Sequence, residues 1–139
     1  MTLRAWMAPA LLLLFASSAN AVNPEDLLSA SQAFKVSGVR AASGEIYLTF
    51  DIAPGYALYR DKIRIGTAAS SPAVISTLTL PHGTLVADPD SGAKEQWRSR
   101  AIATLTTKTS GPVLLAVKIQ GCADVGVCFN PEVREVLVR

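Results

Sequence analysis

The sequence predicts an all-β protein, an antiparallel β-sandwich, on two observations. Apolar side chains recur at every second position in several short runs, which is the periodicity of a strand with one buried face. In residues 45–52 the apolar face comprises Ile46, Leu48, Phe50 and Ile52. Clusters of Gly, Pro, Ser and Asp separate these runs at short intervals, as they do in β-sandwiches.

Seven runs with this alternation are the expected strands. They cover residues 34–39, 45–52, 56–65, 73–80, 101–107, 113–120 and 133–138. The expected turns lie between them, at residues 42–44, 54–55, 66–72, 81–83, 88–92 and 110–112. One segment, residues 23–28, favours a short helix because Asn23 can cap it and Pro24 suits its first turn.

The first 21 residues have the features of a secretory signal peptide. Arg4 precedes an apolar run that is too short to span a bilayer, and an Ala-x-Ala cleavage site ends at Ala21. Cleavage would leave residues 22–139 as one domain of 118 residues, with no later run long enough for membrane insertion. We therefore expect an exported protein in a compartment where disulfides persist.

Charge and composition exclude several classes of function. Without Arg4 the chain has 12 basic against 11 acidic residues, so nothing indicates nucleic acid as a partner. The expected domain has one histidine, two cysteines and no methionine, too few ligands to favour a metal site. No phosphate-binding loop or nucleophilic-serine motif occurs, and His82 lies in a Pro-His-Gly turn typical of an exposed loop. We expect no cofactor.

The two cysteines, Cys122 and Cys128, are the strongest candidates for chemistry. A bridge across their seven-residue loop stabilises a fold by about 2 kcal/mol, whereas one joining distant parts of such a domain approaches about 4–5 kcal/mol. A chain reversal at Val125-Gly126 would bring the two residues opposite each other, with Cα atoms about 4.5–5.5 Å apart. Continued alternation from residues 113–120 places Cys122 on the more polar face, so its thiol is expected to lean toward solvent. The spacing therefore suits a redox-active pair better than a structural staple.

Two stretches resemble a known family. Residues 121–132, Gly-Cys-Ala-Asp-Val-Gly-Val-Cys-Phe-Asn-Pro-Glu, are similar to the active-site hairpin of the DsbD N-terminal domain family, found in bacterial thiol:disulfide interchange proteins. Residues 55–65, which begin Gly-Tyr-Ala-Leu-Tyr-Arg, are similar to a segment that lies near the cysteines in that family. The Pro-His-Gly turn and residues 95–100 fit the same register, so the resemblance covers nearly all of the expected domain.

The resemblance implies an immunoglobulin-like fold that exchanges disulfides in the periplasm. Electrons would come from a thioredoxin-like domain and pass to partners such as disulfide isomerases or cytochrome-maturation thioredoxins. Cys128 would form the mixed disulfide and Cys122 would resolve it. Tyr56 and Tyr59 would flank the pair, although either could be an ordinary sandwich residue.

Two departures from the family pattern bear on the site. The family has a cap loop with an aromatic residue over the disulfide, and residues 88–92 provide none. Asp88 and Asp90 could disfavour a thiolate if they lie close, or could simply form a solvated acidic loop. DsbD itself continues into membrane and thioredoxin-like domains, so this chain is expected to receive electrons from a separate protein.

Several alternatives stay open at this point. Phe129 is a candidate binding residue beside Cys128, although, like Trp97, it is most simply a core or hairpin-packing aromatic residue. Arg60, Lys62 and Arg64 are expected to alternate on one strand face, which suits an acidic partner or plain solvent. The alternative function is a non-catalytic immunoglobulin-like binding or adaptor module whose disulfide is structural.

Overall fold

The computed structural model describes residues 23–90 and 92–139, and the expected signal peptide lies outside them. The strands are β1 (Phe34–Arg40), β2 (Ile46–Ile52), β3 (Tyr56–Tyr59), β4 (Arg64–Thr67), β5 (Ile75–Thr79), β6 (Thr84–Asp88), β7 (Gly92–Trp97), β8 (Arg100–Thr107), β9 (Val113–Ile119), β10 (Gly121–Ala123) and β11 (Glu132–Val138). The helices are short: η1 (Pro24–Asp26), α1 (Ala30–Ala33) and η2 (Arg60–Lys62). Within these residues, no helix is both long and apolar enough to cross a membrane.

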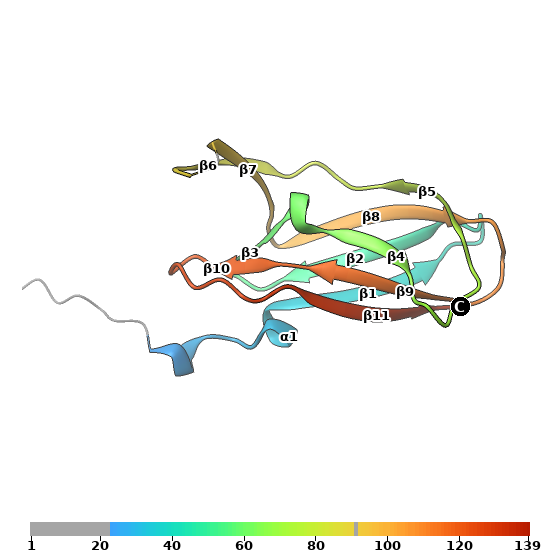
Figure 1. Ribbon diagram of the computed structural model, residues 1–139, viewed down its shortest axis with the longest axis horizontal. Helices are drawn as coiled ribbons and strands as arrows, with labels where there is room; N and C mark the ends of the chain where they lie inside the picture. The colour runs from blue at the N-terminus through green and yellow to red at the C-terminus, as the bar shows by residue number, and fades with distance from the viewer. Residues whose placement is uncertain (1–22, 91) are drawn as a thin grey trace, which may run out of the picture.

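The strands form an antiparallel sandwich (Figure 1). One sheet has the order β1-β2-β8-β5, a second has β11-β9-β4, and a third has β10-β3-β7-β6. The second and third sheets are linked along the chain because a single residue, Gln120, separates β9 from β10. The hairpin with both cysteines therefore continues the central strand of one sheet into the edge of another.

The core lies between the sheets and confirms the predicted alternation. The four apolar residues of β2 are buried on one face, and the residues between them are half-buried. Strand β9 repeats the pattern with Val113, Leu115, Val117 and Ile119. Both apolar rows belong to one cluster of buried residues, so the all-β sandwich prediction is confirmed.

The predicted strand over residues 56–65 is wrong. Tyr56–Tyr59 pairs with β10 and β7, whereas Arg64–Thr67 pairs with β9, and the turn η2 carries the chain between the two sheets. Arg60, Lys62 and Arg64 therefore do not alternate on one strand. The strand is interrupted because its two halves pair with strands of different sheets, which the local sequence pattern does not show.

The N-terminal segment also differs from the prediction. Only Pro24–Asp26 of the expected helix is helical, as a single 3-10 turn, while α1 forms four residues later. Ser29 precedes α1, and its backbone N–H donates to Oε1 of Gln32 at 3.0 Å, which satisfies one of the free donors at the helix start. The sequence prediction missed α1, β6 and β7, and it did not foresee that β10, the first arm of the predicted hairpin, pairs with β3.

Candidate functional site

Cys122 and Cys128 form a disulfide across the predicted hairpin. Their Cα atoms are 4.0 Å apart, closer than the sequence led us to expect. The ladder hydrogen bonds are made by their neighbours, from the Ala123 N–H to the Val127 carbonyl (2.7 Å) and from the Phe129 N–H to the Gly121 carbonyl (3.0 Å). The cysteines are thus a non-hydrogen-bonded pair, the type in which facing side chains lie closest.

Two glycines give the hairpin its shape. Gly126 has a φ of +97°, and its N–H donates to the Ala123 carbonyl at 3.0 Å, which closes the turn at the predicted place. Gly121 lies opposite Leu58 of β3, where a Cβ would collide with the carbonyl oxygen of Ala57 and the ring of Phe34. The residue before Cys122 must therefore be glycine for β10 to approach β3.

The two sulfur-bearing residues differ in exposure. Cys128 is exposed, whereas Cys122 is only 7% exposed. Cys122 pairs with Ala57, and neither belongs to the apolar core cluster, which agrees with the predicted outer face. The expectation that its thiol leans toward solvent is wrong, because alternation sets the face of a strand and not what covers that face. A reagent from solvent meets Cys128 first.

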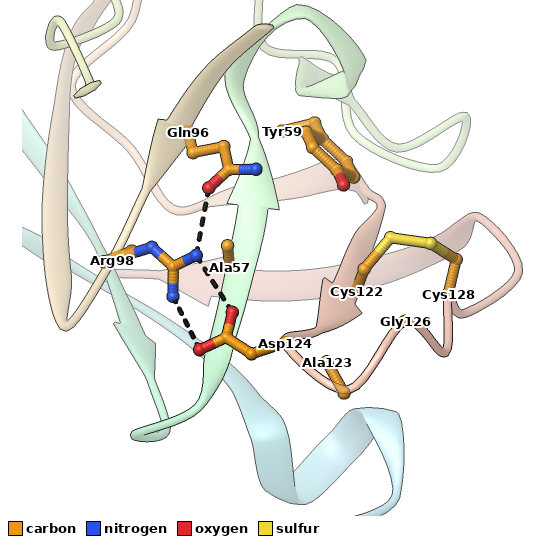
Figure 2. A pocket seen from close by; sticks show the side chains of 9 residues that line it. All are labelled: Ala57, Tyr59, Gln96, Arg98, Cys122, Ala123, Asp124, Gly126 and Cys128. Atoms are coloured by element: carbon orange, nitrogen blue, oxygen red, sulfur yellow. Dashed lines mark hydrogen bonds and ion pairs between the residues drawn. A yellow bond between two sulfur atoms is a disulfide. The ribbon is translucent and has the colours of Figure 1, made fainter. Parts of the chain in front are cut away.

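A surface hollow of about 270 Å³ lies beside the disulfide (Figure 2). Its lining comprises both cysteines with Ala57, Tyr59, Gln96, Arg98, Ala123, Asp124 and Gly126. The guanidinium of Arg98 contacts both carboxylate oxygens of Asp124, at 2.9 and 3.1 Å, and donates to Gln96 Oε1 at 3.1 Å. Asp124 also donates its backbone N–H to the Gly55 carbonyl at 2.8 Å. The hairpin is thereby tied to β7 and to the turn before β3.

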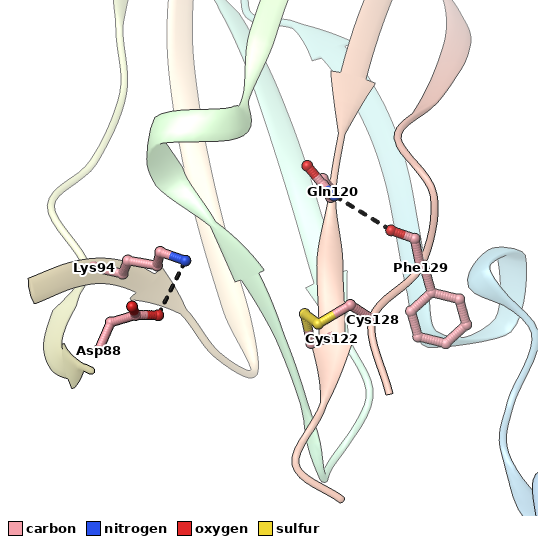
Figure 3. The surroundings of a disulfide bond; sticks show 6 residues. All are labelled: Asp88, Lys94, Gln120, Cys122, Cys128 and Phe129. Atoms are coloured by element: carbon pink, nitrogen blue, oxygen red, sulfur yellow. Dashed lines mark hydrogen bonds and ion pairs between the residues drawn. A yellow bond between two sulfur atoms is a disulfide. The ribbon is translucent and has the colours of Figure 1, made fainter. Parts of the chain in front are cut away.

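Tyr59 lies beside the disulfide, in the lining of this hollow. Lys94 lies over its ring, with the Nζ atom 5.3 Å from the ring centroid. Lys94 in turn contacts Asp88 at 3.0 Å, and the hydrogen bond to that carboxylate raises the pKa of Lys94 (Figure 3). The contact with Lys94 partly neutralises the charge of Asp88. Asp90 is exposed, and its backbone N–H donates to Asp88 Oδ1 at 3.0 Å.

Tyr56 and Phe129 lie on the core side of the hairpin. Their rings pack with Phe34 in a cluster with centroid distances of 5.5 to 6.1 Å. The hydroxyl of Tyr56 accepts a hydrogen bond from the Leu28 N–H at 2.8 Å, which attaches the N-terminal segment to β3. Of the two tyrosines, the structure therefore brings Tyr59 to the outer face with Cys122 and places Tyr56 beneath it.

A comparison with protein-family models matches residues 24–139 to the family described as "Thiol:disulfide interchange protein DsbD, N-terminal". The chain belongs to this family. The DsbD protein of Escherichia coli K12 is 34% identical over 123 residues, and that of Cronobacter sakazakii is 33% identical over 115 residues. These alignments cover 88% and 82% of this chain but 21% and 19% of the relatives. The chain thus spans about a fifth of the length of the DsbD proteins that it matches.

Solved structures of DsbD N-terminal domains share the fold. The reduced domain from Neisseria meningitidis has a TM-score of 0.67 and 28% identity, covering 82% of this chain and 90% of that one. A complex of the DsbD and PilB N-terminal domains from the same organism has a TM-score of 0.66 and 26% identity. The match covers 79% of this chain and 85% of that one. The immunoglobulin-like fold that the sequence resemblance implied is confirmed.

The sequence reasoning missed three polar residues of this DsbD N-terminal domain. Gln96 lies in β7, which was not predicted, and Arg98 follows the last residue of that strand. Lys94, also in β7, supports Tyr59. The opposite charges of Arg98 and Asp124 were a usable signal, but only the strand order β10-β3-β7 brings them together. The side chain of His82 is 94% exposed and lies 3.4 Å from Glu95, as expected of a loop residue.

Proposed function

We propose that this DsbD N-terminal domain exchanges disulfides in the periplasm and relays electrons between thioredoxin-like partners through Cys122 and Cys128. The observation that carries the proposal is the difference in exposure between the two cysteines of one hairpin. Cys128 is open to a partner, whereas Cys122 is largely covered. The neisserial relatives support the same view, because one was solved in a reduced form and another in a complex with the PilB N-terminal domain.

The oxidised domain accepts two electrons from a dithiol donor. The donor thiolate attacks Sγ of Cys128, the Cys122–Cys128 bond breaks, and Cys122 leaves with the electron pair and takes up a proton. The donor's second thiolate then attacks the donor sulfur that is bonded to Cys128, which forms the donor disulfide and releases Cys128 as a thiolate. The donor departs oxidised and the domain is left as a dithiol.

The reduced domain passes the electrons on by the reverse sequence. Cys128 attacks the acceptor's disulfide and expels one acceptor thiolate, which forms a second mixed disulfide. Cys122 then attacks Sγ of Cys128, and the acceptor leaves as a dithiol. Tyr59 and the Arg98–Asp124 pair border both sulfurs, so they form part of the surface that a partner meets.

A trapping experiment tests the role of each cysteine. Cys122→Ala keeps the exposed sulfur and removes the resolving one, so it should accumulate a mixed disulfide with a thioredoxin-like partner. In cells the trapped complex should be found in the periplasmic fraction. The matched control, Cys128→Ala, should accumulate little, because Cys122 is covered.

Two results would contradict the proposal. Accumulation only in Cys128→Ala would reverse the two roles. If the wild-type disulfide stayed oxidised beside a reduced partner, with a potential below about −300 mV, it would be a structural bond and the domain a binding module.

A further inference from the structure

We infer that a basic cluster on the same outer face as Cys122, made of Lys62, Arg64 and Lys118, docks an acidic segment of the exchanging partner. The inference rests on the proposed exchange function and adds the charge of the partner. The three side chains line a hollow of about 350 Å³ together with Gln120 and Pro131. Among the described residues, no acidic side chain lines this hollow, and all three basic side chains are exposed to solvent.

The arrangement of the cluster carries an energetic cost in the isolated domain. Arg64 of β4 lies directly opposite Lys118 of β9, and like charges directly opposite each other destabilise a strand pair. Arg64 cannot turn away freely, because its guanidinium donates to the carbonyls of Asp61 at 2.8 Å and Ile63 at 2.7 Å. An incoming carboxylate would relieve this repulsion, so the cluster is set up for an anionic partner.

Nearby acids offset the charge of the cluster only in part. Asp61 directly precedes Lys62, but its charge also acts on Lys94. The carboxylate of Glu132 contacts Arg134 at 2.6 Å. Glu135 lies opposite Ala116, one position beyond the cluster, and balances at most one of its three charges. The other outer neighbour of Lys118 is Val133, which is apolar and exposed. A net positive charge therefore remains on this face.

The cluster is continuous with the redox site. Lys118, Gln120 and Cys122 follow one another on the outer face as β9 passes into β10, so Lys118 lies about 13 Å from Cys122 along the strand. Gln120 donates to the Phe129 carbonyl at 3.5 Å, next to Cys128 (Figure 3). Gln120, which precedes the hairpin, and Pro131, which follows it, thus both line the basic hollow. The hollow that both cysteines line is different, because Asp124 balances Arg98 there.

The structure also corrects the set of basic residues that the sequence indicated. Arg60 does not belong to the cluster, because its guanidinium contacts Glu95 at 3.4 Å and donates to the Pro81 and Leu80 carbonyls. Lys118, which the sequence did not single out, takes its place through the pairing of β4 with β9.

Short thiol peptides of different charge test the inference on the intact domain. Each peptide has an N-terminal cysteine, a glycine and then four glutamates, four glutamines or four lysines, and an extended peptide of this length spans the roughly 13 Å to the cluster. The rate of mixed-disulfide formation is measured by acid quenching and mass spectrometry. Rates are normalised to the reaction of each peptide with a neutral small disulfide, which corrects for differences in thiol pKa.

We expect the glutamate peptide to react roughly tenfold faster than the glutamine peptide near 10 mM salt, because steering by several charges accelerates encounter by at least this factor. The advantage should disappear near 500 mM salt, where the Debye length falls to a few ångströms. In the variant Lys62→Gln/Arg64→Gln/Lys118→Gln, the glutamate peptide should have no rate advantage at any salt concentration, while the glutamine peptide still reacts. The control Lys35→Gln/Lys108→Gln/Arg139→Gln removes the same net charge from residues outside the cluster. In this control the glutamate peptide should keep its rate advantage.

The outcomes separate this inference from the function on which it rests. If no peptide opens the wild-type disulfide, the exchange function fails. If all peptides react at rates independent of charge and salt, or if both triple variants lose the same advantage, exchange stands and the docking cluster is refuted. Inhibition by sulfate at constant ionic strength, equal for all three peptides, would show a small-anion site instead and would also refute it. The salt series on the wild type decides the question even if the cluster variant does not fold.

Discussion

Reduction of the disulfide should leave the sandwich folded at a modest cost in stability. Neither cysteine belongs to the apolar core cluster, and the bond closes a loop of only seven residues, Cys122 to Cys128. The chain-entropy relation then gives about 2 kcal/mol of stabilisation. By linkage, the same energy makes the folded disulfide about 40 mV harder to reduce than the same bond in the unfolded chain, since about 30 mV corresponds to 1.4 kcal/mol.

Urea unfolding of the oxidised and reduced domain measures this difference directly. We expect a cooperative transition in both states, similar slopes, and a midpoint shift equivalent to about 2 kcal/mol. A Cys122→Ala/Cys128→Ala variant should match the reduced protein and controls for effects of the reductant. A loss above about 5 kcal/mol, or a reduced domain without a cooperative transition, would mean that the bond holds the sandwich together. The redox cycle would then have to be coupled to folding.

Two further substitutions test the packing and the charges around the site. Gly121→Ala should lower the free energy of unfolding in urea by about 1–3 kcal/mol, because the added Cβ meets the carbonyl of Ala57. In Gly66→Ala the added Cβ enters open space, so the loss should be clearly smaller. Equal losses in the two variants would contradict the close approach of Gly121 to β3. The Gly83 N–H donates to Glu95 at 2.6 Å, and this hydrogen bond lowers the pKa of Glu95. Glu95 therefore stabilises the fold above its ordinary pKa near 4.3 and ceases to do so as the pH falls through its lowered value. Glu95→Gln should lower the melting temperature at pH 7, and the difference from the wild type should shrink as the pH falls below about 4.3. A difference independent of pH would refute this account.

The sequence predicts strands well where one face is buried. Along Ile46–Ile52 and Val113–Ile119 the sandwich buries every second side chain, so the pattern is visible without a structure. Strand β6 has no such face: Leu85 is 72% exposed and Val86 is 37% exposed, so the strand shows no alternation. The turn at Arg60–Lys62 was missed because the sheet switch depends on partner strands and not on local pattern.

The site divides along similar lines. The pairing of Cys122 with Cys128 and the turn at Gly126 are local, so sequence reasoning could place them. The covering of Cys122 and the contact of Arg98 with Asp124 depend on strands from different parts of the chain. The role of Tyr59 came from the family resemblance, and its position beside the disulfide has a physical cause in the pairing of β3 with β10.

The shortness of the disulfide loop also bears on how the protein matures. The cysteines are six positions apart, and a loop of about this length closes within about 10–100 ns in an unfolded chain. The two sulfurs can therefore meet before any sheet has formed. Because the 139 residues contain only these two cysteines, no incorrect pairing exists within the chain. Oxidation does not have to wait for folding, and maturation needs no step that corrects pairing within the chain.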